Sequence, residues 1–292
     1  MNPWLLAARP KTLPAAVVPV AVGAALAHAL TGHVAVGLVL CALAGSICIQ
    51  IATNFFNDAL DHRKGADTAA RLGPTRVTAG GLLGAKAVMA LGAAILALAC
   101  GFAAPMIAVR GWPVVAIGLP SLYFSFGYTG GPWPLAYRGL GELFVLLFFG
   151  LVAVSGTVFV ATGQWWWGPS LWLGTQVGFL STALIAINNL RDVAEDRTTG
   201  KRTLAVRFGE GFARVEIAIC CAAPLLMSAG WPWVAGWSWW CLLPFMLLPG
   251  AFFLSRSVAT TPPGRLYNRF LALAGAQLLG FALLFSLAVL LR

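Results

Sequence analysis

Charged residues are scarce in this sequence. Only 10% of its 292 residues are Asp, Glu, Lys or Arg, whereas soluble domains carry roughly 25%. Hydrophobic residues make up 60%, and apolar runs of about 20 residues, long enough to cross a bilayer, recur along the chain. This composition excludes an ordinary soluble domain. It predicts an all-α polytopic membrane protein that forms a single domain over residues 1–292.

Nine of the apolar runs are expected to cross the membrane as helices. They lie at residues 14–31, 34–56, 85–109, 112–129, 140–162, 168–188, 211–229, 235–254 and 270–291. An Asn- and Asp-rich segment follows both the second and the sixth run, which indicates two related four-helix halves with a ninth helix added. Gly174 and Gly178 form a G-x-x-x-G spacing, which predicts close helix packing.

Acidic residues are rarer than basic ones, nine against nineteen, which gives a net charge of +10. In a soluble chain this excess would suggest a nucleic-acid partner. With nine spans, however, every Lys and Arg except Arg110 and Arg292 falls on one side of the membrane. The positive-inside rule makes that side cytoplasmic. We therefore expect no nucleic-acid partner, a lipid-embedded chain in a bacterial cytoplasmic (inner) membrane, a cytoplasmic N-terminus and an outer C-terminus.

The two Asp-rich segments contain most of the acids. On a continued helix Asn54, Asp58 and Asp61 would share one face, and the second segment repeats this spacing from Asn188. Acids at the end of a membrane helix usually face an interior cavity and are paired or bound to a metal. Carboxylate and amide oxygens suit Mg²⁺, whereas the six cysteines form no C-x-x-C pair. The candidate acids are Asp58, Asp61, Asp67, Asp192, Glu195 and Asp196.

Basic residues surround these acids, which points to a polyanion such as a diphosphate bridged by metal. They are Lys64, Arg71, Arg76, Arg191, Lys201 and Arg202. A solvated loop is the ordinary alternative for either segment, and a transporter is the competing functional class. The acids, however, cluster at one end of the spans, whose middles are nearly free of ionisable groups. The pattern therefore favours an enzyme.

At these residues the sequence resembles the UbiA superfamily of intramembrane prenyltransferases. The resemblance rests on N-D-A-L-D at 57–61 and D-V-A-E-D at 192–196 and extends over nearly the whole chain. Four further stretches are similar to the menaquinone (MenA) branch of that superfamily: A-R-P-K-T-L at 8–13, K-G-A-D at 64–67, G-P-T-R at 73–76 and the segment 188–204.

The resemblance implies an Mg²⁺-dependent enzyme that joins a polyprenyl diphosphate to an aromatic acid. In the MenA branch the acceptor is 1,4-dihydroxy-2-naphthoate, which loses CO₂ to give demethylmenaquinol. Another phenolic acceptor, such as 4-hydroxybenzoate or homogentisate, stays open. Which acid holds which ion, the prenyl chain length, the oligomeric state and the roles of His62 and Glu195 also stay open.

The resemblance also implies which residues form the site. The catalytic and metal-binding residues are Asn57, Asp61, Asp192 and Asp196, with Asp58 and Asp67 as further metal residues. The diphosphate contacts are Lys64, Arg71, Arg76, Arg191 and Lys201. Arg9 and Lys11 either receive the acceptor carboxylate or are ordinary membrane anchors. We interpret Phe144, Phe148 and Phe149 first as lipid-facing surface, with a groove for the prenyl tail as the alternative.

Overall fold

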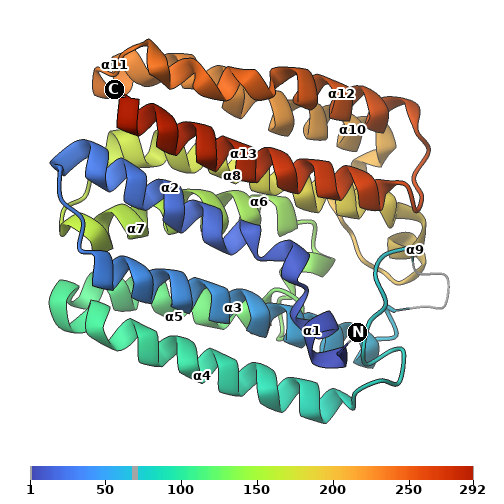
Figure 1. Ribbon diagram of the computed structural model, residues 1–292. Helices are drawn as coiled ribbons and strands as arrows, with labels where there is room; N and C mark the ends of the chain where they lie inside the picture. The colour runs from blue at the N-terminus through green and yellow to red at the C-terminus, as the bar shows by residue number, and fades with distance from the viewer. Residues whose placement is uncertain (1, 68–71, 292) are drawn as a thin grey trace.

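Long apolar helices run side by side in the computed structural model, which describes residues 2–67 and 72–291 (Figure 1). Eight helical segments within these ranges are long and apolar enough to cross a membrane. They are Pro14–Thr31 (α2), Val36–Arg63 (α3), Ala85–Arg110 (α4), Gly141–Thr162, Trp167–Arg191 (α8), Leu204–Ala235, Trp239–Thr260 and Tyr267–Leu291 (α13). The predicted all-helical membrane fold is confirmed at this level.

Three of these segments combine different helix types. Gly141–Thr162 consists of α6 (Gly141–Val145), a π-helix η3 (Leu146–Val152) and α7 (Ala153–Thr162). Leu204–Ala235 consists of α10 (Leu204–Leu226), η4 (Met227–Gly230) and α11 (Trp231–Ala235). Trp239–Thr260 begins as the 3₁₀-helix η5 (Trp239–Leu247) and continues as α12 (Leu248–Thr260).

The fourth predicted span corresponds to a shorter helix, α5 (Trp112–Gly127). Its 16 residues span about 24 Å at 1.5 Å per residue, less than the hydrocarbon thickness of about 30 Å. Nine full-length spans are therefore not confirmed among the described residues.

The helix ends that carry the two Asp motifs lie at the same end of the bundle, which we call the charged end. There α3 continues beyond residue 56 to Arg63, so that the first Asp motif is helical. In contrast, α8 ends at Arg191, Asp192 has φ −96° and ψ 9°, and the short helix α9 begins at Val193 and ends at Thr198. The helices α1 (Pro3–Ala8) and η1 (Pro10–Thr12) lie at the same end (Figure 1). Both Asp-rich segments are thus brought to one end of the molecule.

Glycines allow α8 to approach the π-helix η3 very closely. A Cβ atom built on Gly150 would overlap the carbonyl oxygen of Gly174 and the backbone of Gly178. The predicted packing role of the G-x-x-x-G spacing is confirmed. On its other sides α8 contacts α2, α10 and α13, where the main apolar core lies. Packing from all these directions holds the helix that leads into the second Asp motif.

Candidate active site

A cavity of about 1280 Å³ extends from the charged end into the bundle. Along α3 its lining reaches from Asp61 to Ala42, about 28 Å at 1.5 Å per residue. The charged end of the cavity is lined by Asn57, Asp61, Arg76, Asn188, Arg191, Asp192, Glu195, Asp196 and Lys201. The cavity therefore joins the two Asp motifs at a single polar end.

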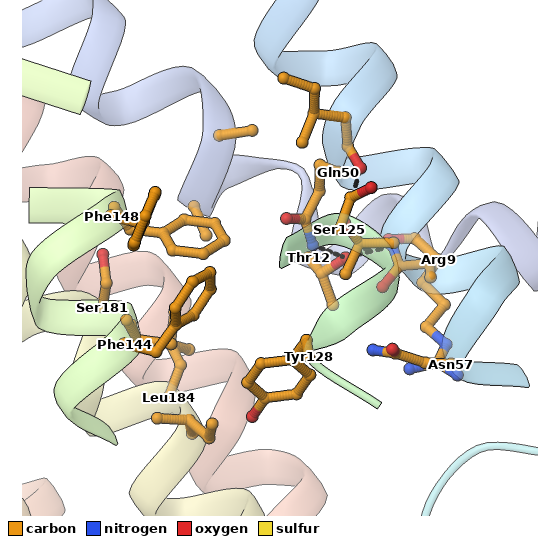
Figure 2. A pocket seen from close by; sticks show the side chains of 18 of the residues that line it. Arg9, Thr12, Gln50, Asn57, Ser125, Tyr128, Phe144, Phe148, Ser181 and Leu184 are labelled. Atoms are coloured by element: carbon orange, nitrogen blue, oxygen red, sulfur yellow. Dashed lines mark hydrogen bonds between the residues drawn. The ribbon is translucent and has the colours of Figure 1, made fainter. Parts of the chain in front are cut away.

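The rest of the cavity wall is largely apolar. Phe144 and Phe148 stack with ring centroids 4.5 Å apart, and both contact the ring of Phe124. Figure 2 shows Phe144 and Phe148 beside the cavity, and Phe149 also lines it. The interpretation of this run as lipid-facing surface was therefore incomplete, because these aromatic residues line an internal cavity.

Arg9 and Lys11 also line the cavity, Arg9 on the elbow between α1 and η1 and Lys11 within η1. Arg9 has φ 50°, a left-handed conformation that is uncommon outside glycine. Next to this elbow, the amide nitrogen of Asn54 donates to Ala8 O and to Thr12 Oγ1, both at 3.0 Å. These bonds fasten the N-terminal elbow to α3, so that both expected acceptor contacts face the same cavity as the acids.

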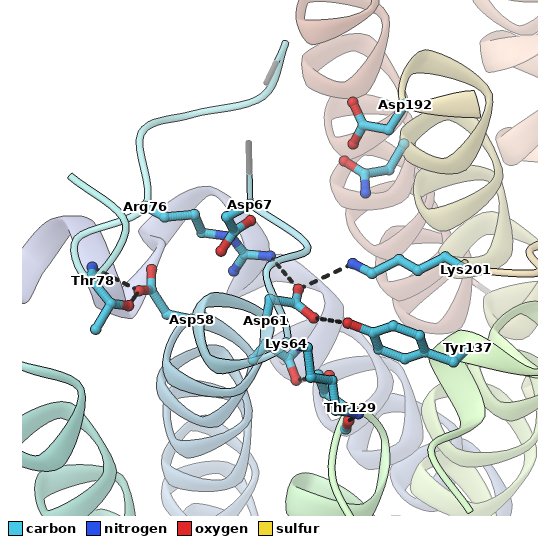
Figure 3. Close-up of polar contacts among 12 residues, drawn as sticks. Asp58, Asp61, Lys64, Asp67, Arg76, Thr78, Thr129, Tyr137, Asp192 and Lys201 are labelled. Carbon is cyan, nitrogen blue, oxygen red and sulfur yellow. Dashed lines mark hydrogen bonds and ion pairs between the residues drawn. The ribbon is translucent and has the colours of Figure 1, made fainter. Parts of the chain in front are cut away.

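Asp61 is the centre of the polar end. It is 3% exposed, and three donors from distant parts of the chain converge on it (Figure 3). Its Oδ2 accepts from Arg76 Nη2 at 3.0 Å and from Lys201 Nζ at 3.1 Å, while Oδ1 accepts from the Tyr137 hydroxyl at 2.9 Å. A buried carboxylate is stable only with such partners. Two of the five expected diphosphate contacts are thereby placed around a motif aspartate.

Asp192 is held by its chain neighbour Arg191. The guanidinium is 1% exposed and donates from Nε and Nη2 to the two carboxylate oxygens at 2.8 and 2.6 Å. It also donates to Asn188 Oδ1 at 2.7 Å and to Asn268 Oδ1, on α13, at 2.8 Å. Arg191 thus orients the second motif in addition to lining the cavity, a role that the sequence did not predict.

Asp196 lies on α9, one turn beyond Asp192, and is buried. Burial is the main cause that raises the pKa of Asp196 to about 7. Lys201 opposes the shift, whereas the charges of Asp192, Glu195 and Asp61 add to it. Lys201 also connects the two motifs, because its backbone N–H donates to Asp196 O at 3.0 Å and its ammonium group donates to Asp61. Glu195 also lines the cavity, while His62 is exposed outside it.

Asn57 lines the cavity and accepts a hydrogen bond from the Thr129 hydroxyl through Oδ1. Lys64 does not line the cavity: its ammonium group donates to Thr129 O and lies 4.2 Å from the centre of the Tyr137 ring. Lys64 therefore supports the neighbouring side chains. Arg71, another expected diphosphate contact, lies outside the described residues.

Asp58 and Asp67 do not line the cavity. Both oxygens of Asp58 turn to the segment after Arg76, away from Asp61 (Figure 3). Asp67 Oδ1 accepts from Arg76 Nε at 3.3 Å. The prediction that Asn54, Asp58 and Asp61 share one face was therefore wrong for Asp58. Asn57, and not Asp58, lines the cavity on that face.

Three contributors were not predicted, namely Thr129, Tyr137 and Asn268. Each is a single polar residue in a stretch without a recognisable motif. Asn268 lines the cavity, and its amide nitrogen donates to Leu72 O at 3.0 Å, which links α13 to the loop after the first motif. The basic and Asp-rich segments of the sequence do not indicate which isolated polar residues will contact the site.

The donor set at the polar end fits Mg²⁺. Asn57, Asp61, Asp192 and Asp196 offer carboxylate and amide oxygens, the ligands that this ion prefers. Within the described residues no group of three or more His, Cys, Asp or Glu side chains is already arranged around a single point. Mg²⁺ commonly uses one or two carboxylates together with phosphate oxygens and water.

A polar end that combines acids with cations, continued by a long apolar cavity within membrane helices, defines the class of intramembrane prenyltransferases. Residues 16–274 match the UbiA prenyltransferase family, and the chain belongs to that family. It is also similar throughout its length to a solved UbiA homologue from Archaeoglobus fulgidus bound to GPP and Mg²⁺ (TM-score 0.71, 14% identity, 100% of both chains). An apo UbiA homologue from Aeropyrum pernix gives a TM-score of 0.69 at 17% identity, over 95% of this chain and 97% of that one.

Curated relatives are more similar in sequence. The 1,4-dihydroxy-2-naphthoate octaprenyltransferase of Haemophilus influenzae is 34% identical over 84% of this chain and 82% of its own length. The enzyme of the same name from Mycobacterium tuberculosis is 35% identical over 79% of both chains, and that from Escherichia coli is 37% identical over 72% and 70%.

Proposed function

We propose that this chain transfers a polyprenyl group from polyprenyl diphosphate to 1,4-dihydroxy-2-naphthoate with loss of CO₂, which yields demethylmenaquinol. The proposal is carried by the shared cavity, in which Asp61, Asp192 and Asp196 meet Arg76 and Lys201 at the mouth of an apolar channel. The choice of acceptor is supported by the relatives of 34% to 37% identity that carry this activity in their names.

In this proposal Asn57, Asp61, Asp192 and Asp196 hold Mg²⁺, which when bound supplies charge stabilisation to the diphosphate. Arg76 and Lys201 contact the diphosphate, since both cationic groups already lie at Asp61 and face the cavity. Arg191 keeps Asp192 in place. Lys64 acts through Tyr137 and Thr129, and Arg71 keeps its predicted place among the diphosphate contacts.

The two reactants occupy different parts of the cavity. The prenyl tail lies along the apolar wall beside Phe144 and Phe148, and the acceptor carboxylate approaches Arg9 and Lys11. The allylic C–O bond breaks with its electron pair going to the pyrophosphate, and ring electrons form the new bond at the carbon that bears the carboxylate. The C–C bond to the carboxylate then breaks, CO₂ leaves and its electron pair restores the ring. The apolar wall excludes the water that would otherwise trap the allylic cation.

The topology belongs to the same proposal. We infer that residues 1–292 form a single domain with nine crossings, of which α5 is the short one, arranged as two related halves and a ninth helix. The distribution of Lys and Arg supports a charged end in the cytoplasm, together with the N-terminus, and a C-terminus on the outer side of a bacterial cytoplasmic membrane.

The test uses purified protein in detergent with Mg²⁺, a radiolabelled allylic polyprenyl diphosphate and 1,4-dihydroxy-2-naphthoate. Wild type should form a lipid-soluble prenylated product. EDTA, Asp61→Ala and Asp192→Ala should each abolish it, and added Mg²⁺ should reverse the effect of EDTA. The matched control is Glu210→Ala, since Glu210 pairs with Arg214 outside the cavity lining.

Product formed only with 4-hydroxybenzoate or homogentisate would keep the site and reject the acceptor. Absence of product with every acceptor, combined with solute movement in vesicles, would reject the enzyme in favour of a transporter.

A further inference from the structure

Asp58 belongs to the first Asp motif, yet its carboxylate is already occupied. It is 1% exposed. Its Oδ1 accepts from Thr78 N at 3.0 Å and from the Thr78 hydroxyl, and its Oδ2 accepts from Val77 N at 3.2 Å (Figure 3). Three donors from two consecutive residues therefore bind both oxygens of the carboxylate.

Helix geometry explains why Asp58 differs from its neighbours. At about 100° per residue, Asp61 lies 60° from Asp58 around α3 and 40° from Asn57. Asn57 and Asp61 line the cavity, whereas Asp58 lies at the edge of that face and turns to the loop. A metal ion in the cavity thus has Asn57 and Asp61 within reach, and Asp58 is turned away from it.

The segment that Asp58 holds comes directly after Arg76. The Arg76 guanidinium is bonded to Asp61 at 3.0 Å and to Asp67 at 3.3 Å, and the residue is 7% exposed. Its carbonyl oxygen accepts from Gly80 N at 2.9 Å, which closes a turn around the Asp58 contacts. The backbone on the C-terminal side of Arg76 is therefore fixed by the same helix that carries Asp61.

We propose that Asp58 is a positioning residue: it anchors residues 77–78 to α3 and so presents the Arg76 guanidinium to the diphosphate at Asp61. The proposal rests on the function proposed above for its effect on substrate, but the anchoring itself does not. An Asp58 side chain that acts through Arg76 should lose its influence once Arg76 is removed, which is the criterion of a double-mutant cycle.

The anchoring is tested without any substrate by limited trypsin digestion and mass spectrometry. The Arg76–Val77 bond should resist cleavage in wild type, because Arg76 is buried and its following residue is held. Asp58→Asn replaces one acceptor by a donor and should speed cleavage at this bond by about tenfold or more, the scale of a lost charge-assisted hydrogen bond. Glu210→Gln serves as the control. If Asp58→Asn fails to fold, Thr78→Val removes one of the three donors and should show a smaller acceleration.

The effect on substrate is tested by calorimetric binding of geranyl diphosphate with Mg²⁺ and no acceptor. Asp58→Asn and Arg76→Ala should each weaken binding by about tenfold, and the double variant should bind as weakly as Arg76→Ala alone. The Mg²⁺ concentration at half-saturation should change in Asp61→Asn and stay constant in Asp58→Asn.

The digestion tests the anchoring, and the binding measurements test the action of Asp58 through Arg76. Unchanged cleavage in Asp58→Asn and Thr78→Val overturns the anchoring, whatever the enzyme does. Additive losses in the double variant, or a shifted Mg²⁺ requirement in Asp58→Asn, overturn the action through Arg76 and make Asp58 a direct participant. A wild type that binds no prenyl diphosphate refutes the proposed function, while the digestion still decides the anchoring.

Discussion

Replacing Tyr137 by Phe removes one hydroxyl group from the surroundings of Asp61. The hydroxyl donates to Asp61 Oδ1 at 2.9 Å. Burial, followed by the charge of Asp61, raises the pKa of Tyr137 above its ordinary value, so the phenol stays protonated and remains a donor at any working pH. Tyr137 therefore orients a proposed Mg²⁺ ligand without replacing it.

The expected size of the effect can be worked out in two ways. A hydrogen bond to a charged group contributes about 1.5–3 kcal/mol, which corresponds to roughly 10- to 140-fold at 1.4 kcal/mol per factor of ten. Loss of a hydrogen bond to a metal ligand typically weakens metal binding by about 10- to 100-fold. Tyr137→Phe should therefore raise the Mg²⁺ concentration for half-maximal activity by one to two orders of magnitude, with kcat nearly restored at saturating Mg²⁺.

The assay is Mg²⁺ activation of product formation at fixed saturating concentrations of both substrates. Tyr123→Phe is the matched control, because Tyr123 is 52% exposed on α5. An unchanged Mg²⁺ requirement in Tyr137→Phe would refute the orienting role. A loss of kcat that no Mg²⁺ concentration restores would show that the hydroxyl acts on the substrate.

Three further predictions concern other parts of the molecule. Arg191→Met should lower stability by about 3–5 kcal/mol, since it leaves a buried carboxylate without its bidentate partner; thermal unfolding in detergent measures this, with exposed Arg197→Met as control. Because burial raises the pKa of Asp196 to about 7, the carboxyl is protonated below that pH and must lose its proton to bind Mg²⁺. The Mg²⁺ requirement should therefore rise as pH falls from 8 to 6, and Asp196→Asn should abolish this dependence. Gly150→Ala should destabilise the bundle by about 1–3 kcal/mol, because the added Cβ meets the backbone of α8. The added Cβ of Gly101→Ala meets nothing, so this control should show unchanged or slightly higher stability in the same thermal assay.

Sequence patterns predicted those features that repeat or extend over many residues. Apolar runs gave the membrane helices, and the two Asp motifs gave the polar end. The partner of Asp61 at Tyr137 and the link from Asn268 to Arg191 were missed, because each depends on one residue brought close by tertiary packing.

Errors arose where local geometry decides. The shared face of α3 was assigned from residue spacing alone. Asp58, at the edge of that face, instead contacts a loop whose position could not be predicted from the sequence. The fourth span was predicted at residues 112–129, and its helix α5 ends two residues earlier, at Gly127.

The cavity has all its charge at one end, and this has a consequence for turnover. Before transfer, a prenyl diphosphate is retained by its charged head, because its apolar tail would be solvated equally well by lipid tails. After transfer, the charge leaves with pyrophosphate and the tail stays on the quinol, so the quinol has no charged group that binds the polar end. Lipid tails are as apolar as the cavity wall, so the quinol gains nothing by staying and partitions into the bilayer. Pyrophosphate should accordingly be the inhibitory product, and accumulation of the quinol in the membrane should leave the rate unchanged.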